Sequence, residues 1–248
     1  MTDSLGWRLK LGVIVPCTNT VVQPELDAMK PRGVTNHVAR VAIPDTPVTT
    51  EEELSLMMTG VRTAIEGSID GLATCAPGHI VIGMSAETFW EGILPPDELR
   101  SRFEQHAGVG VTLGMDACKE AIKRYGSIKR IGIITPYMPA GDAQVRRTFT
   151  DAGFDVVNLL GLKCNSPLLS AHEPAARLRR AVQEVDDANI ELIIQVGTNL
   201  AFAAVAGEAE QWLGKPVLAA NTCSYWHALR HNGIEDRMPG FGSLLEEY

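Results

Sequence analysis

The sequence lacks the features that mark several classes of protein. Its 248 residues include only five cysteines, an odd number without regular spacing, and no CxxC, HExxH or acidic calcium-loop pattern occurs. These absences argue against a disulfide framework and against a structural metal site. No apolar run approaches the ~18 residues that a membrane-spanning helix requires. We therefore expect neither a metal nor a membrane as a partner.

Positive charge is also scarce. Lys and Arg number 22 against 30 Asp and Glu, which gives a net charge of −8, and the basic residues are scattered. The basic footprint of a nucleic-acid-binding protein is therefore missing. The first ten residues, MTDSLGWRLK, lack the apolar segment of a signal peptide, and no glycine-rich phosphate fingerprint follows a strand. We expect a cytoplasmic protein that binds no nucleic acid and needs no cofactor.

What the sequence does contain is a regular alternation of short apolar runs and helical patterns. Runs that are apolar throughout, separated by helices, indicate a parallel sheet covered on both faces. The sequence therefore predicts an α/β fold. The expected strands are 11–15, 37–43, 80–84, 130–135, 154–162, 191–196 and 215–220, and the expected helices are 51–74, 96–106, 113–125, 141–152, 173–188 and 201–213.

A weak internal repeat divides the chain into two similar halves. LGVIVPCTNTVVQPELDAM matches IGIITPYMPAGDAQVRRTF in pattern, and IVIGMSAETFWEG matches IIQVGTNLAFAAV. The order of the units predicts two pseudo-symmetric Rossmann-like domains, each a parallel sheet flanked by helices. We assign residues 1–112 plus 219–248 to the first domain and 113–218 to the second. Because ligands bind outside the carboxyl ends of such strands, four turns are expected to meet in one cleft between the domains.

These four turns are rich in neutral hydrogen-bond donors. They contain Asn19, Ser85, Tyr137 and the run Gly197 to Asn199. Hydroxyl, amide and backbone N–H donors suit a carboxylate at a helix start and stabilise a developing oxyanion without a metal. Each residue also has an ordinary structural interpretation, because Asn and Ser are standard helix caps and a tyrosine is often half-buried with a wet hydroxyl.

The segment PCTNTVVQPEL resembles the P-S-S-N-T start of the maleate cis-trans isomerases and arylmalonate decarboxylases, within the aspartate/glutamate racemase superfamily. The resemblance continues through GMSAETFWEG, TPYMPAGDAQV, LKCNSP and QVGTNLAF, and so spans nearly the whole chain. It implies two pseudo-symmetric α/β domains with the active site between them. The implied function is a cofactor-independent isomerase or decarboxylase that acts on a small carboxylic acid through an enolate-like intermediate. We also expect a homo-oligomer.

The resemblance also implies roles for individual residues. Asn19 and Asn165 match carboxylate-binding asparagines, and Tyr137 matches a tyrosine that donates to the carboxylate or enediolate. The two thiols of the family fall at Met84 and Val196. The expected substrate-binding set is Asn19, Met84, Ser85, Ala86, Asn165, Val196, Gly197, Thr198 and Asn199.

At the two thiol positions the chain departs from the family. Neither a thioether nor a valine can supply a thiolate, and a slip of one residue would place Ser85 or Gly197 there instead, again without a thiol. We therefore name Cys17 and Glu87, with Tyr137, as the candidate catalytic residues. The structural alternatives are a small polar filler for Cys17 and a first-turn helix acid for Glu87.

Two further functions stay open from the sequence alone. One is a hydrolase or hydratase that uses a bound water in the space left by the cysteines, and the other is a non-catalytic relative that binds a small carboxylate. Among the remaining cysteines, Cys75 and Cys118 fit core or loop positions, whereas Cys164 and Cys223 are expected nearer the cleft, Cys164 without a partner in sequence to activate it. His79 and His227 fit structural positions better than catalytic ones, because His79 begins a strand and His227 lies in a late helix.

Overall fold

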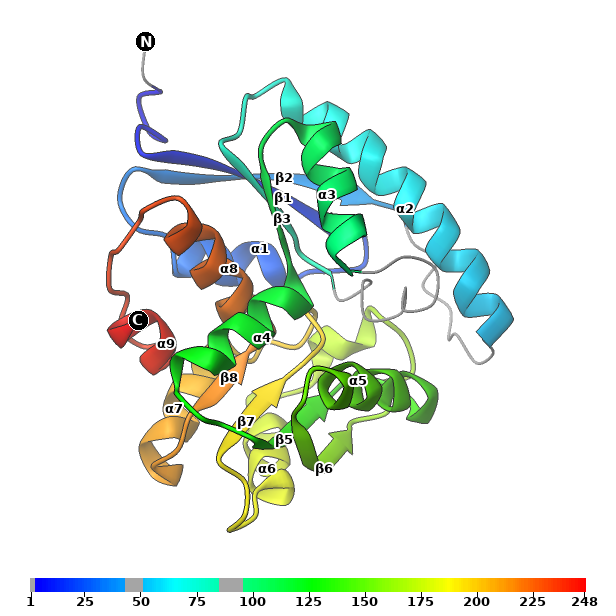
Figure 1. Ribbon diagram of the computed structural model, residues 1–248, viewed down its shortest axis with the longest axis vertical. Coiled ribbons are helices and arrows are strands. Elements are labelled where there is room, and N and C mark those ends of the chain that lie inside the picture. Colours follow the sequence, from blue (N-terminus) through cyan, green and yellow to red (C-terminus); the bar gives the residue numbers. More distant parts are fainter. Residues whose placement is uncertain (1–2, 43–50, 85–95) are drawn as a thin grey trace.

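The structure is a computed structural model that describes residues 3–42, 51–84 and 96–248, with backbone only for 51–59, 62 and 96. It contains two four-stranded parallel sheets with the strand orders β2-β1-β3-β4 and β6-β5-β7-β8 (Figure 1). The first sheet consists of β1 (Leu9–Pro16), β2 (Val34–Val41), β3 (His79–Ile82) and β4 (Gly110–Leu113). The second consists of β5 (Arg130–Thr135), β6 (Asp155–Gly161), β7 (Leu192–Gln195) and β8 (Val217–Ala219).

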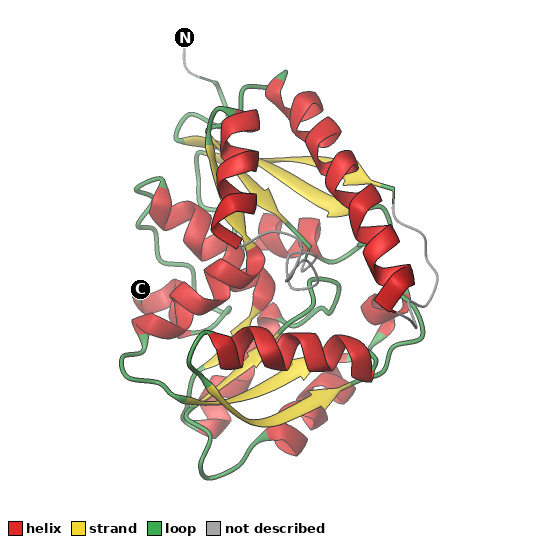
Figure 2. Cartoon of the chain, turned by 45° about the vertical axis from the view of Figure 1, so that its right-hand side comes forward, coloured by secondary structure: helices red, strands yellow, loops and turns green. Residues whose placement is uncertain are grey.

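Helices cover both faces of each sheet (Figure 2). In chain order they are α1 (Val22–Ala28), α2 (Glu51–Ala73), α3 (Pro96–Ala107), α4 (Gly114–Arg124), α5 (Pro139–Asp151), a 3-10 turn (Leu169–His172), α6 (Ala175–Val185), α7 (Ala203–Leu213), α8 (Ala220–His231) and α9 (Ser243–Glu247). None of the helices in the described ranges combines the length and the apolar character needed to span a bilayer.

The two halves share one topology. In the first sheet Ile14 of β1 pairs with Ile82 of β3, and in the second Ile134 of β5 pairs with Gln195 of β7. The strand orders correspond element by element, with β1 to β4 matching β5 to β8. The expected α/β fold with two pseudo-symmetric parallel sheets is therefore confirmed, and the internal repeat in the sequence is the trace of this symmetry.

One strand escaped the sequence analysis. β4 (Gly110–Leu113) runs into α4 at Gly114 with no turn between them. The run is only four residues long and contains the polar Thr112, so it was not recognised as a strand, and the expected helix began at 113. The structure corrects this, and β4 completes the first sheet as its edge strand beside β3.

The hydrophobic core is continuous between the halves. One cluster of buried side chains takes members from both sheets, among them Val13 and Val81 from the first and Ile133 and Ile194 from the second. Helices α4 and α8 pack against each other between the sheets. Each sheet has a second cluster on its outer face, beneath α2 and α3 in the first half and beneath α6 and α7 in the second. The sheets are thus held in a fixed relation by shared apolar packing.

Candidate active site

The turns that follow β1, β3, β5 and β7 lie against one another, and we call them the strand-end junction (residues 16–20, 83–84, 136–138 and 197–199). Three of the turns are joined through one hydroxyl group. Asn19 Nδ2 donates to Thr198 Oγ1 at 3.2 Å, and Thr198 Oγ1 donates to the Gly83 carbonyl at 3.2 Å. Because Thr198 follows β7 while Asn19 and Gly83 follow β1 and β3, these bonds connect the two halves.

The fourth turn reaches the junction through Gly197. This residue has a φ of +114°, and a Cβ placed on it would lie 2.4 Å from Pro136 Cδ and 3.5 Å from the Tyr137 hydroxyl oxygen. Only glycine fits this backbone conformation and this close approach. The Tyr137 hydroxyl therefore lies beside the start of the Gly197 to Asn199 turn, and all four turns meet.

Asn19 is buried, with 3% of its surface exposed. Its Oδ1 accepts the backbone N–H groups of Val21 at 3.0 Å and Val22 at 2.9 Å, so its carbonyl end caps α1. Arg40 Nη1 donates to the Asn19 main-chain carbonyl at 2.8 Å. Capping thus occupies only the oxygen of the side chain, and the amide N–H₂ group points toward the junction.

Asn199 ties three segments together. Its Oδ1 accepts the N–H of Thr20 at 3.0 Å, and its Nδ2 donates to the carbonyls of Thr18 at 3.3 Å and Pro167 at 2.8 Å. Asn165, which is exposed, lies two residues before Pro167. The segment that carries the second expected carboxylate-binding asparagine is therefore anchored to the junction.

Hydrogen bonds to neighbouring residues hold the turn that carries the half-buried Tyr137. Its backbone N–H donates to Thr135 Oγ1 at 3.1 Å, and the Thr135 hydroxyl donates to the Asp142 carboxylate. Burial raises the pKa of Asp142, and the Thr135 hydrogen bond opposes that rise. The Asp142 carboxylate lies against the backbone of Gly161, which has no Cβ to block it. These contacts hold the Tyr137 turn to the end of β6.

Of the two candidate proton carriers, the structure describes Cys17 but not Glu87. Cys17 is exposed directly after β1, and its N–H donates to the Val41 carbonyl at 2.7 Å. Glu87, together with Ser85 and Ala86, lies outside the described residues. The sequence-based roles of these three residues therefore stay predictions.

Met84 and Val196, the positions matched to the family's thiols, are both buried but are not equivalent in the two halves. The Gly83 N–H donates to the Ile14 carbonyl, and the Val196 N–H donates to the Ile134 carbonyl, each at 2.8 Å. Val196 thus corresponds to Gly83, one residue before Met84. Met84 packs in the outer cluster of the first half, whereas Val196 packs in the cluster shared by both sheets.

The structure adds a carboxyl group that the sequence analysis did not select. Glu25 Oε1 accepts the N–H of Ala203 at 2.9 Å, and its Oε2 accepts Asn221 Nδ2 at 2.7 Å. Asn221 Nδ2 also donates to the Thr198 carbonyl at 3.0 Å. Burial raises the pKa of Glu25 to about 7, with hydrogen bonds from Asn221, Ala203 and Phe202 acting in the opposite direction. In the sequence Glu25 looks like an ordinary acid of a first helical turn.

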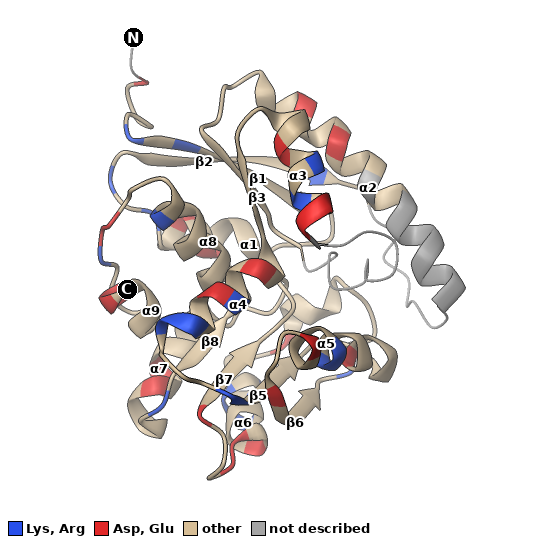
Figure 3. Ribbon diagram, in the orientation of Figure 1, with Lys and Arg blue, Asp and Glu red and all other residues tan. Residues whose placement is uncertain are grey.

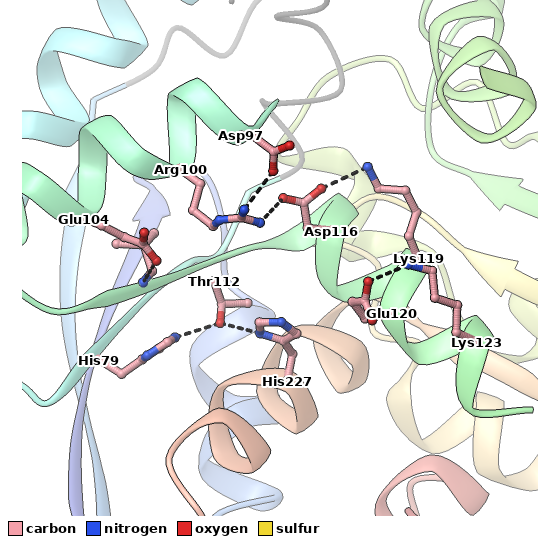
Figure 4. A network of polar contacts seen from close by, with 11 residues as sticks. His79, Asp97, Arg100, Glu104, Thr112, Asp116, Lys119, Glu120, Lys123 and His227 are labelled. Carbon is pink, nitrogen blue, oxygen red and sulfur yellow. Dashed lines mark hydrogen bonds and ion pairs between the residues drawn. The ribbon is translucent and has the colours of Figure 1, made fainter. Parts of the chain in front are cut away.

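His79 and His227 belong to a separate network at the start of β3, which Figure 4 shows. Thr112 Oγ1 lies 2.8 Å from His79 Nε2 and 2.9 Å from His227 Nδ1. His79 begins β3, while the junction follows the end of that strand. In the described part of the chain, no group of three or more His, Cys, Asp or Glu residues is arranged to hold a metal ion.

Charged residues of both signs occur along the described chain, and helices α3, α4 and α5 each carry both signs (Figure 3). The junction itself is built mainly from neutral amides, hydroxyls and backbone N–H groups. The fold and this junction define an α/β protein with two similar halves, in which neutral hydrogen-bond donors lie together at the carboxyl ends of the parallel strands.

Comparison with known proteins identifies the family. The sequence model of the arylmalonate decarboxylase family matches residues 11–245, and the chain belongs to this family. The maleate isomerase of Alcaligenes faecalis is 23% identical over 245 residues, covering 95% of this chain and 96% of the relative. The maleate isomerase of Geobacillus stearothermophilus is 26% identical over 252 residues, covering 96% and 97%.

Solved structures of the same family share the fold. A mutant of Nocardia farcinica maleate cis-trans isomerase with a covalently bound succinylcysteine intermediate superimposes with a TM-score of 0.85 at 19% identity, covering 97% of this chain and 99% of the other. A liganded mutant of arylmalonate decarboxylase gives a TM-score of 0.82 at 17% identity, covering 97% and 100%. The family resemblance noted in the sequence is confirmed.

Proposed function

We propose that this chain is a cofactor-independent isomerase or decarboxylase that acts on a small carboxylic acid through an enolate-like intermediate. The observation that carries the proposal is the strand-end junction, where Asn19, Thr198 and the Tyr137 hydroxyl come together from both halves. A carboxylate and an enolate both need several preorganised donors, and neutral donors supply them without a metal. Family membership supports the same class of reaction.

Each group has a proposed role. The Asn19 amide and the Tyr137 hydroxyl donate to the carboxylate that remains attached to the reacting carbon, together with the Gly197 backbone, while the Thr198 hydroxyl donates to the Gly83 carbonyl and holds the Asn19 amide in place. Asn165 and Asn199 complete the binding of the substrate, and Ser85 and Ala86 contribute from the turn that follows β3. Met84 and Val196 are buried in different core clusters, so their proposed contribution is apolar packing beneath the turns.

The reaction proceeds without an oxidant or a reductant. In a decarboxylation the bond between the reacting carbon and one carboxyl group breaks, carbon dioxide leaves, and the electron pair is delocalised into the remaining carboxylate. A proton then forms the new C–H bond. We propose Cys17 or Glu87 as the proton carrier, because a positioned acid or base contributes 10²–10⁴-fold to such a step and neither Met84 nor Val196 can act.

We propose a division of the chain into residues 1–112 plus 219–248 and residues 113–218. It is supported by α8, which follows the last strand of the second sheet but packs against β3 and β4 of the first, in addition to its packing against α4. We further propose a homo-oligomer in the cytoplasm. Light scattering over a range of protein concentrations tests the assembly, and a monomer throughout contradicts it.

Turnover of chosen probes tests the function. Maleate and phenylmalonate are incubated with the protein in D₂O, and NMR follows fumarate or phenylacetate and the deuterium at the reacting carbon. We expect conversion of at least one probe and a higher melting temperature with malonate, since a bound ligand stabilises the folded state. Binding without turnover of any probe would instead favour a non-catalytic carboxylate-binding protein.

Single variants then identify the proton carrier. We expect a loss of about 10²-fold or more in either Cys17→Ala or Glu87→Gln. Cys75→Ala is the control, because Cys75 precedes β3 and lies at the other end of that strand from the junction. Full activity in both test variants would contradict both assignments and favour a bound-water mechanism.

A further inference from the structure

Glu25 connects three helices at the boundary between the halves. It lies in α1, its Oε1 accepts the Ala203 N–H at the start of α7, and its Oε2 accepts the Asn221 amide of α8. The residue as a whole keeps some exposure, but burial is the dominant influence on its carboxyl group. A carboxylate in such a place is costly unless it is hydrogen-bonded.

The contacts continue from Glu25 into the strand-end junction. Asn221 Nδ2 has two hydrogens, and it donates one to Glu25 at 2.7 Å and the other to the Thr198 carbonyl at 3.0 Å. Both donors of the amide are therefore used. The Thr198 hydroxyl, on the same residue, meets Asn19 and the Gly83 carbonyl. Glu25 therefore contacts Asn221, and Asn221 contacts Thr198, the residue whose hydroxyl joins the two halves.

We propose that Glu25 is a positioning residue, which holds the Thr198 turn in its working arrangement through Asn221 and releases it when the Glu25 carboxylate takes up a proton. The proposal rests on the proposed function for the use of Thr198, but the ordering of the turn is independent of any substrate.

The protonation state matters because of the donors around the carboxyl group. The groups that face it are the N–H groups of Phe202 and Ala203 and the Asn221 amide, all of which are neutral donors. The two oxygens of the ionised carboxylate accept hydrogen bonds from all of these donors. The O–H of the protonated carboxylic acid is itself a donor, so it faces one of them without forming a hydrogen bond. Protonation near pH 7 therefore removes at least one of these bonds, and the ordered arrangement belongs to the higher pH.

Hydrogen exchange measures the ordering directly. Peptides that cover 196–206 are followed by mass spectrometry between pH 5.5 and 8.5, with rates corrected for the intrinsic effect of pH. In the wild type we expect protection of this segment to fall as the pH is lowered through about 7. In Glu25→Gln we expect exchange at least 10-fold faster than in the wild type at pH 8, with no transition near pH 7.

Two further variants separate positioning from general stability. Glu210→Gln is the matched control, because Glu210 is also a partly buried carboxyl with a raised pKa that accepts backbone N–H groups, from Val217 and Ser243, outside the junction. It should leave the 196–206 transition in place. Asn221→Ala keeps the bond from Ala203 to Glu25 but cuts the link to Thr198, so the turn at 197–199 should exchange fast at every pH.

The outcomes are distinct. Protection of 196–206 in Glu25→Gln or in Asn221→Ala equal to that of the wild type overturns the proposal, and so does the same loss in Glu210→Gln. Malonate titration of the wild-type protein tests the proposed function separately. Without malonate binding the proposed function fails, while the exchange data still decide the role of Glu25. With binding, we expect at least 10-fold weaker affinity in Glu25→Gln at pH 8 and unchanged affinity in Glu210→Gln.

Discussion

The two ends of the central strand β3 carry two different buried polar networks. At its start, His79, Thr112 and His227 form a chain within the first half and α8 (Figure 4). Beyond its end, the Gly83 carbonyl joins the network of Thr198, Asn19, Asn221 and Glu25, which crosses between the halves. The first network joins imidazoles through a hydroxyl, and the second surrounds one carboxyl group with neutral donors. Burial shifts the pKa values in both networks, but the two shifts change the stability of the folded state in opposite directions as the pH falls.

Burial disfavours the charged form of each titratable group. It lowers the pKa of His79 from 6.5 to about 3 and raises that of Glu25 from 4.5 to about 7. As the pH falls below 6.5, the unfolded chain protonates His79 before the folded one does, so stability is lost. Between pH 4.5 and 7 the folded state keeps the Glu25 proton that the unfolded chain releases, so stability falls as the pH rises. The two networks therefore oppose each other between pH 4.5 and pH 6.5, where the two ranges overlap.

The largest expected effect concerns His79. The difference between 6.5 and about 3 corresponds to up to about 5 kcal/mol of stability lost between pH 6.5 and pH 3. His79→Gln cannot take up the proton, so its stability should fall less steeply with acid than that of the wild type. Denaturant unfolding at several pH values measures this, and parallel curves for the two proteins would show that His79 does not govern the acid limb.

The Glu25 network predicts a change of opposite sign. Glu25→Gln removes an ionisation that costs the wild type up to about 3 kcal/mol once the pH exceeds 7. The stability of the variant relative to the wild type should therefore rise by up to this amount from pH 4.5 to pH 8. The same unfolding series provides the measurement, with Glu210→Gln as the comparison. A relative stability that is independent of pH would contradict the raised pKa.

The difference between the networks also explains what the sequence could predict. β5 was predicted at its observed bounds, Arg130–Thr135, because its apolar run lies between charged residues and a proline. The donor-rich turns were found because each directly follows a strand. Glu25 was missed because its partners, Ala203 and Asn221, lie 178 and 196 residues further along the chain. A local sequence pattern gives no information about contacts that form only when the two halves pack together.

Register was a second limit. The family resemblance assigned the two thiol positions to Met84 and Val196, whereas the backbone bonds to Ile14 and Ile134 make Gly83 the counterpart of Val196 in the internal repeat. Strand pairing fixes register through the backbone, and side chains switch face at every step. A one-residue difference therefore moves a side chain from one core cluster to another, as it does for Met84. Sequence patterns without pairing information cannot resolve such a step.

The bridging threonine of each network gives a matched pair of variants. Thr112→Val leaves a buried nitrogen of His79 and a partly buried nitrogen of His227 without their partner, and we expect a loss of about 2 kcal/mol. Thr198→Val leaves the Asn19 amide and the Gly83 carbonyl unpaired, at a similar or smaller cost to stability. Only Thr198→Val should also weaken malonate binding. Calorimetry measures both quantities, and loss of binding in Thr112→Val would contradict the separation of the two networks.

The smallest expected effect on stability comes from Asn199. Its amide makes three bonds across the junction, to Thr20, Thr18 and Pro167, but the side chain is only half-buried, so water replaces part of what Asn199→Ala removes. We expect a loss of about 1 kcal/mol. The Pro167 bond holds the segment that bears Asn165, so malonate affinity should fall more than stability suggests. Asn189→Ala is the control, because Asn189 bonds only locally to Asp187 through its side chain. If both variants bind malonate as the wild type does, the 165–167 segment contributes nothing to the carboxylate site.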